Sequence, residues 1–347
     1  MLSYRYALAL FLLGTLPAHA QTISETSLTS NVAGQAQFTD PNLVDAWGVS
    51  YSPSGNFWIS DNKSGLATVY DGTGNPQSLV VTVPSASGSG TGSPTGQVYN
   101  PKTNEFQITQ NGKKGPATFI FVTEDGTISG WNSDVNATSA VVAVNMAHEH
   151  AMFTGAALYT DGSGQDHLLV TDFHRGVVRE FDTSFNQTAT YRDNFLSPDF
   201  QPFNVAVLNG NIYIAYAEAD NTRRHIIPGK GVGDVDLVTA VGSVVFNAEL
   251  GSLDAPWGMA VAPASWGALA GKLMVSDVGS GQISLFDLNN LAAAGVVENG
   301  STPVKIKGLR ALIPGNGGGG GSADDVYFTA GPDRGADGLF GSLSSSN

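Results

Sequence analysis

The fold is decided by the stretch Asp61-Asn-Lys-Ser-Gly65-Leu-Ala-Thr-Val-Tyr70-Asp71, because its outline recurs along the chain. In each copy an acidic residue is followed by a turn that contains glycine, a β-rich run and an aromatic residue. The further copies start at Glu124, Asp172, Asp277 and Asp333. A hairpin pattern that repeats about every 50 residues is typical of stacked β-sheet units such as propeller blades.

Six segments share a longer outline around these copies, in which two apolar strands precede the hairpin and a variable outer strand follows it. Their first strands start near Trp47, Pro94, Phe153, Pro202, Pro256 and Gly308. The last segment ends soon after its third strand, and residues 23–29 can supply the missing outer strand. We therefore predict an all-β chain whose residues 21–347 form a single domain. That domain is a six-bladed β-propeller with four-stranded blades, and an N-terminal strand closes its ring.

Composition narrows the class of partner. Charged residues are 13% of the 347 residues, hydrophobic residues are 41%, and there are 43 glycines, which suits many short strands joined by tight turns. The formal net charge of -14 excludes a nucleic-acid partner, because phosphate contacts need Lys and Arg. The chain has no cysteine, so it forms no disulfide and no thiolate metal site.

The N-terminus has the pattern of a signal peptide. Arg5 supplies positive charge, residues 7–16 are an apolar run, and Ala18-His19-Ala20 is a small-x-small cleavage site. We predict that residues 1–20 are removed before Gln21. The mature protein is then secreted or periplasmic, has no membrane span and is a monomer.

Carboxylates recur at the end of the second strand in five segments. They are Asp61, Glu124, Asp172, Glu218 and Asp277. In a propeller these positions open on the same face, and a ring of oxygen ligands suits Ca²⁺. The alternative is that they start tight turns and bind their own backbone, so that their repetition follows from the repeat itself.

A second candidate metal site is Met146-Ala-His148-Glu-His150-Ala-Met152. In an extended strand these four Met and His side chains would point to one face. Imidazole and thioether ligands suit copper, and His pairs also suit zinc. A solvent-facing connection between two blades is the alternative.

The channel face offers four candidate contact residues. Trp47 and Trp257 each precede a glycine and can stack on a sugar or an aromatic ligand, or pack between blades. Asn204 occupies the corresponding position in another segment, and Arg310 can bind an anionic ligand. Nucleophilic catalysis has little support, because there is no Gly-x-Ser-x-Gly elbow. His167 and His174 lie near carboxylates in sequence, but spacing alone does not make a triad.

Several of these motifs resemble a known family. They include Asp45-Ala-Trp47-Gly48, Pro94-Thr95-Gly96, Pro202-Phe203-Asn204, Ala255-Pro256-Trp257-Gly258 and Tyr327-Phe-Thr-Ala-Gly331-Pro332. The chain resembles an uncharacterised family of secreted bacterial proteins that is distantly similar to NHL-type six-bladed propellers. Some members carry a C-terminal PEP-CTERM sorting tail, which this sequence lacks after Gly338-Leu-Phe-Gly341. The resemblance implies fold and export, but no activity.

Three functional hypotheses follow. The first is an exported module that binds a small molecule, a glycan or a protein through its loop-rich channel face, with or without a cation. The second is a Ca-dependent hydrolase, lactonase or lyase, in which a channel ion polarises a carbonyl or activates water. The third is a structural component of the cell surface or matrix. The fold alone does not choose among them.

Overall fold

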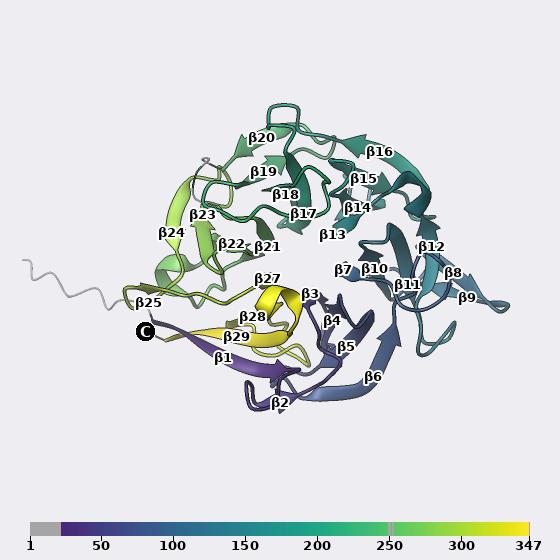
Figure 1. Cartoon of the computed structure of the whole chain (residues 1–347), viewed down its shortest axis with the longest axis horizontal. Helices are drawn as coiled ribbons and strands as arrows, with labels where there is room; N and C mark the ends of the chain where they lie inside the picture. Colours follow the sequence, from purple (N-terminus) through teal and green to yellow (C-terminus); the bar gives the residue numbers. More distant parts are fainter. Residues whose placement is uncertain (1–21, 249–250, 252, 347) are drawn as a thin grey trace, which may run out of the picture.

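The computed structural model describes residues 22–248, 251 and 253–346. In these residues the chain is built from strands and turns, and sheets surround a central axis (Figure 1). The short exceptions are the 3₁₀ turns η1 (Ala147–Glu149) and η2 (Gly267–Leu269) and the four-residue α1 (Pro332–Gly335). No helix in the described ranges is long and apolar enough to cross a membrane. The predicted signal peptide lies outside the described residues.

Five sheets are four-stranded antiparallel blades, numbered here in chain order. Blade 1 contains β3 (Ala46–Ser50), β4 (Phe57–Asp61), β5 (Leu66–Tyr70) and β6 (Pro76–Thr82). Blade 2 contains β7 (Pro94–Tyr99), β10 (Phe119–Thr123), β11 (Thr127–Trp131) and β12 (Val141–Asn145), with the hairpin β8 (Gln107–Gln110) and β9 (Lys113–Pro116) as an insertion. Blade 3 contains β13 (Phe153–Thr160), β14 (Asp166–Asp172), β15 (Val177–Phe181) and β16 (Gln187–Tyr191). Blade 4 contains β17 (Phe200–Leu208), β18 (Asn211–Glu218), β19 (Gly233–Val238) and β20 (Val244–Asn247). Blade 5 contains β21 (Pro256–Val261), β22 (Leu273–Asp277), β23 (Ile283–Phe286) and β24 (Ala293–Val296).

The two ends of the described chain meet in a seven-stranded sheet, called here the closing sheet. Its order is β26 (Thr302–Pro303), β25 (Glu298–Asn299), β1 (Thr22–Ser30), β29 (Leu339–Ser346), β28 (Asp325–Ala330) and β27 (Leu309–Pro314), with β2 (Phe38–Thr39) parallel to β1. The purple β1 lies beside the yellow β29 in Figure 1, and their pairing runs from Thr22↔Ser346 to Ser30↔Leu339. The prediction that an N-terminal strand supplies the outer pairing is confirmed.

The prediction of an all-β propeller with four-stranded blades is confirmed. Five blades are separate four-stranded sheets, one fewer than the six predicted. The remaining segment of the repeat, which begins near Gly308, lies in the closing sheet. The sequence pattern locates this segment correctly, but β25 and β26 extend its sheet beyond the four strands that the pattern predicts.

The core lies between neighbouring sheets, which explains why the second strands are apolar on both faces. All five residues of β4 are buried. Phe57 and Ile59 pack toward the closing sheet with Tyr327 and Phe340, whereas Trp58 packs toward blade 2 and stacks on Phe119. Because side chains alternate along a strand, a blade packed on both sides needs a nearly continuous apolar run.

The inner strands approach one another so closely that some positions admit only glycine. A Cβ added at Gly96 would lie 2.6 Å from the backbone nitrogen of Ala156 on the next blade. Polar side chains connect the same strands, since Thr95 Oγ1 donates to the Phe153 carbonyl at 2.8 Å. These contacts hold the inner strands in a fixed ring around the axis and position the residues of the channel.

Candidate functional site

A cavity of about 530 Å³ opens at one mouth of the channel and is called here the channel-mouth pocket. Its lining comes from blades 1 to 5 and the closing sheet, together with the loops between them. The lining includes Trp47, Glu124, Met152, Phe173, Phe203, Arg224, His225, Ile226, Lys307, Arg310, Asp333 and Arg334. Its volume is in the range of small-molecule sites, and it lies where a propeller gathers its loops.

The base of the pocket is aromatic. The Trp47 ring meets the Phe203 ring edge-on at 5.9 Å and the Trp257 ring edge-on at 5.8 Å. Phe173 extends this layer, with its ring centroid 5.3 Å from that of Phe203. All four side chains are buried, and Met152 and Ile226 pack against the same layer. The pocket therefore offers an apolar, flat-sided surface to a ligand.

Arg310 lies on this aromatic layer. Its guanidinium carbon is 3.8 Å from the centre of the Trp47 ring, and its Nη2 donates to Asp45 Oδ1 at 2.8 Å. The Arg310 and Asp45 side chains are only 10% and 6% exposed. Among the described residues, Nε of Arg310 and Nε1 of Trp47 are buried without a hydrogen-bond partner. Unsatisfied donors of this kind are uncommon in folded proteins and suit an acceptor on a bound molecule.

The rim carries more positive than negative charge. Four Lys or Arg side chains line the pocket (Arg224, Lys307, Arg310 and Arg334), against the two carboxylates of Glu124 and Asp333. Lys307 pairs with Asp333, and Arg310 with Asp45. Arg224 and Arg334 have no carboxylate partner in the described part of the chain. A cationic pocket in a chain of net charge -14 is a local feature that average composition does not explain.

Glu124 is the carboxylate that faces the pocket from blade 2. It is half-buried, and Nδ2 of Asn62 donates to its Oε2 at 3.2 Å. Burial raises the pKa of Glu124, while the Asn62 hydrogen bond and the Arg310 charge act in the opposite direction. A carboxylate with a raised pKa inside a pocket is suited to exchange a proton with a ligand.

The four predicted channel residues line two different cavities. Trp47 and Arg310 line the channel-mouth pocket. Trp257 and Asn204 line a second cavity of about 380 Å³ along the inner strands. Nδ2 of Asn204 donates to the Trp257 carbonyl at 2.7 Å, and Nε1 of Trp257 donates to the Thr154 carbonyl at 3.0 Å. Asn204 and Trp257 therefore connect blades 3, 4 and 5 through hydrogen bonds.

The five predicted carboxylates do not converge. Asp61, Asp172 and Asp277 are each fully buried and bind a side chain seven residues later, in the next strand of their own blade. The three contacts are Thr68 Oγ1 to Asp61 Oδ2 at 2.7 Å, Arg179 Nε to Asp172 Oδ2 at 2.9 Å and Ser284 Oγ to Asp277 Oδ2 at 3.2 Å. Of the five, Glu124 alone lines the pocket, and Glu218 lies at the end of β18.

Burial raises the pKa of all three buried aspartates, and that of Asp277 to about 7. In the part of the chain that the structure describes, no three His, Asp or Glu side chains are grouped as a metal site. The alternative in which the aspartates fix turns of the repeat therefore describes the geometry better than a shared calcium ring. Each of the three aspartates connects the end of the second strand to the third strand of its own blade.

The Met and His segment is not an extended strand, so that prediction is wrong. Asn145 Oδ1 accepts a hydrogen bond from the Ala147 backbone, and the chain turns through η1 to His150, which has a φ of 58°. The side chains diverge: His148 is exposed, Met146 packs beside blade 2 and Met152 is buried at the pocket. The structure does not gather these four residues into a copper or zinc site.

Comparison with known proteins supports the fold. No family model matches the chain. Two uncharacterised proteins of Acanthamoeba polyphaga mimivirus are 29% and 28% identical to it over 328 and 326 residues. Each alignment covers 91% of this chain, and they cover 78% and 84% of the viral proteins. These relatives give no support to the secreted bacterial family that the sequence motifs resemble.

Solved propeller structures also match. Virginiamycin B lyase from Staphylococcus aureus superposes with a TM-score of 0.52 at 12% identity, over 93% of this chain and 99% of the lyase. A luciferin-regenerating enzyme matches with 0.53 at 13% identity, over 93% and 95%. The PQQ-bound aldose sugar dehydrogenase from Streptomyces coelicolor matches with a TM-score of 0.51 at 12% identity, over 95% of this chain and 100% of the dehydrogenase. At such identity the likeness shows the propeller fold and not an activity.

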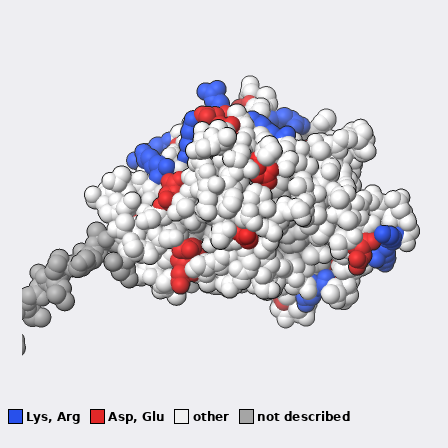
Figure 2. All heavy atoms as spheres, turned by 90° about the horizontal axis from the view of Figure 1, so that it is seen from below, with Lys and Arg blue, Asp and Glu red and all other residues white. Residues whose placement is uncertain are grey.

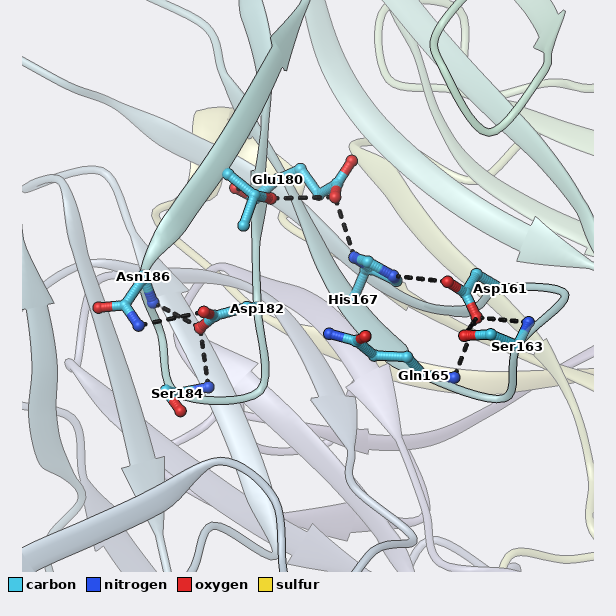
Figure 3. Close-up of polar contacts among 9 residues, drawn as sticks. Asp161, Ser163, Gln165, His167, Glu180, Asp182, Ser184 and Asn186 are labelled. Carbon is cyan, nitrogen blue, oxygen red and sulfur yellow. Dashed lines mark hydrogen bonds and ion pairs between the residues drawn. The ribbon is translucent and has the colours of Figure 1, made fainter.

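His167 is held between two carboxylates in blade 3 (Figure 3). Its Nδ1 lies 2.9 Å from Glu180 Oε1, and its Nε2 lies 3.4 Å from Asp161 Oδ2. Asp161 also accepts hydrogen bonds from Ser163 and from the Gln165 backbone within its own turn. Both ring nitrogens therefore face carboxylates, and none of these residues lines the pocket. His167 fixes the turns of blade 3.

Sequence reasoning missed the rim cations. Arg224 and His225 come from the loop between β18 and β19, whereas Lys307 lies between β26 and β27 and Arg334 lies in α1, both in connections between strands of the closing sheet. In the side view of Figure 2, most of the visible Lys and Arg atoms lie along the upper edge, where Asp and Glu atoms lie among them, and separate groups of Asp and Glu atoms are scattered over the broad side. Of the four cations that line the pocket, Arg310 alone was predicted from the sequence, as a residue that can bind an anionic ligand.

Proposed function

We propose that the chain is a binding module whose channel-mouth pocket takes a small organic anion with a flat apolar body. The observation that carries the proposal is the excess of Lys and Arg at the rim of an aromatic pocket in a strongly acidic protein. Trp47, Phe173 and Phe203 supply apolar contact. Arg224 and Arg334 supply charge that no carboxylate of the described chain neutralises.

Two matched probes test this proposal. Naphthalene-2-carboxylate and naphthalene-2-carboxamide share a shape and differ in charge, so calorimetric titration isolates the contribution of the anion. We expect the carboxylate to bind more tightly, and its affinity to fall as salt screens the rim. The variant Arg224→Gln/Arg334→Gln is expected to weaken carboxylate binding by about tenfold or more, because a hydrogen bond to a charged group contributes about 1.5–3 kcal/mol.

The control is Lys113→Gln, which removes one exposed cation from β9, outside the pocket. It is expected to leave both affinities unchanged. Equal affinity for the two probes, or equal loss in the control, would rule out recognition of an anion by the rim.

A second candidate function is a lyase or hydrolase that uses Glu124 as a general base. It is favoured by the raised pKa of Glu124 and by its place in the pocket beside Arg310. The names of two solved neighbours, virginiamycin B lyase and the luciferin-regenerating enzyme, are compatible with chemistry in such a propeller. In this reading Glu124 accepts a proton and Arg310 stabilises the charge that develops on the substrate.

The variant Glu124→Gln distinguishes catalysis from binding. If the pocket is catalytic, turnover of an aryl ester and lactone panel should fall about a hundredfold or more, while the melting temperature stays close to that of the wild type. Wild-type protein that turns over no member of the panel, yet binds the naphthalene anion, would favour the binding module.

Several sequence predictions stay part of this proposal. We propose that residues 1–20 direct export, that the mature protein is a secreted or periplasmic monomer, and that it belongs to the bacterial family that its motifs resemble. We also propose that β27, β28, β29 and β1 of the closing sheet serve as a sixth blade, and that residues 21–347 are one domain.

A bound calcium ion stays a prediction. The metal content of purified protein, and its melting temperature with and without EDTA, will test it.

A further inference from the structure

Two aspartates lie in the interior between blade 3 and blade 4. Asp234 and Asp236 occupy alternate positions of β19, so their side chains point to the same side of the strand. They are 1% and 0% exposed. Val238, the next residue on that side, packs with Val178 and Leu169 of blade 3. The two carboxyl groups therefore belong to the packed interface between the blades.

Three of their four oxygens have no hydrogen-bond partner among the described residues. These are both oxygens of Asp236 and Oδ2 of Asp234, while Oδ1 of Asp234 accepts from the Val235 backbone at 2.7 Å. The Tyr216 hydroxyl of β18 approaches Asp236, and the Asn247 side chain of β20 approaches Asp234. Neither completes a hydrogen bond with the unpaired oxygens.

Among the described residues, no Lys, Arg or His side chain forms an ion pair with Asp234 or Asp236. Asp193, which follows β16, adds a negative charge near both aspartates, and its carboxyl group lies close enough to that of Asp236 to share a hydrogen bond when one of the two is protonated. Glu180 of β15 is bound to His167. Arg192 and Arg223 line an adjacent cavity of about 250 Å³ together with Tyr216, and neither forms an ion pair with the aspartates. A buried carboxylate without a partner is strongly disfavoured, and a protonated carboxyl group is not.

We propose that the Asp234–Asp236 pair makes the blade 3–blade 4 interface a pH-sensitive contact that is closed when the pair is protonated and loosens when the pair ionises. Burial raises the pKa of Asp234 to about 7 and that of Asp236 to about 8, and the charges of neighbouring aspartates add to the effect. The folded state thus retains protons that the unfolded chain releases near pH 4. The stabilisation of the folded state by these retained protons is complete below about pH 4, and it is lost as the pH rises through the folded-state pKa values of about 7 and 8.

Urea unfolding across pH 5 to 9 tests the proposal. For each aspartate the unfolding equilibrium constant should rise about tenfold per pH unit between its unfolded and folded pKa values. In Asp234→Asn/Asp236→Asn the rise should be smaller, so the variant overtakes the wild type in stability at alkaline pH. Asp134→Asn, an exposed matched control, should follow the wild type. If the double variant keeps the full wild-type slope, the proposal is wrong.

A second measurement needs no variant. Amide exchange of wild-type protein, corrected for base catalysis, should show faster opening of β16, β19 and β20 at pH 9 than at pH 6, relative to blade 2. Uniform protection at both values would contradict the proposal. CaCl₂ titration at pH 8 distinguishes a cation site from a pH-sensitive contact. If added CaCl₂ restores the stability of the wild type saturably but not that of the double variant, the pair binds a cation and the proposal is wrong.

Discussion

Replacing Arg310 with methionine is expected to lower the free energy of unfolding by about 3–5 kcal/mol, as measured by urea denaturation. Arg310 is the buried partner of Asp45 at 2.8 Å, and it also stacks on Trp47. Methionine keeps much of the side-chain volume but removes the charge. The Asp45 carboxylate would then remain buried without its cation, which is the main source of the expected loss.

The double variant Arg310→Met/Asp45→Asn separates this charge effect from packing. Asp45 has a φ of 55°, in the left-handed region that asparagine also tolerates, so Asp45→Asn keeps the backbone unstrained. We expect the double variant to recover a large part of the lost stability, because no unpaired charge is left. A loss of less than about 1 kcal/mol in Arg310→Met would mean that solvent or relaxation replaces the ion pair.

The repeated phrase predicts the hairpins well because it encodes them locally. Asp61 ends β4, Gly65 has the positive φ of 71° that the turn needs, and Thr68 of β5 returns a hydrogen bond to Asp61. The same spacing of seven residues joins Asp277 to Ser284. A reading of the acidic residues alone suggests a shared ring of ligands, whereas the acidic residue taken with its partner seven positions later indicates a contact within one blade.

The junction between blades 2 and 3 shows where sequence periodicity stops being informative. Alternation of Met and His from Met146 to Met152 looks like one face of a strand. The Asn145 side chain instead accepts a hydrogen bond from the Ala147 backbone and starts a turn. Polar residues that bind their own backbone in this way compete with strand formation, so alternation outside an apolar run is weak evidence for a strand.

The pocket was harder to predict than the fold because its residues meet only when the ring closes. Glu124 comes from blade 2, Arg224 from the loop of blade 4 and Arg334 from α1, which precedes the last strand. No local spacing relates them. Trp47 and Arg310 could be predicted because each begins an inner strand, and the order of strands in a propeller places those positions beside the axis.

Replacing Trp47 with alanine is expected to lower the free energy of unfolding by about 3–5 kcal/mol, because it removes a buried indole from the centre of the molecule. The indole contacts Phe203, Trp257 and the Arg310 guanidinium, so no single neighbour can fill the space. The loss would also join the channel-mouth pocket to the second cavity, which Trp257 lines. Urea denaturation measures the first effect, and titration with naphthalene-2-carboxylate measures the second.

Trp47→Phe is the matched variant, since it keeps an aromatic ring over Phe203 and beneath Arg310. We expect it to be destabilised less than Trp47→Ala and to retain part of the affinity for the naphthalene anion. If Trp47→Ala folds with a loss of under about 1 kcal/mol and binds the anion as the wild type does, the indole is neither a packing centre nor a wall of the ligand pocket. If stability falls but affinity does not, Trp47 supports the channel, and the rim cations bind the ligand without it.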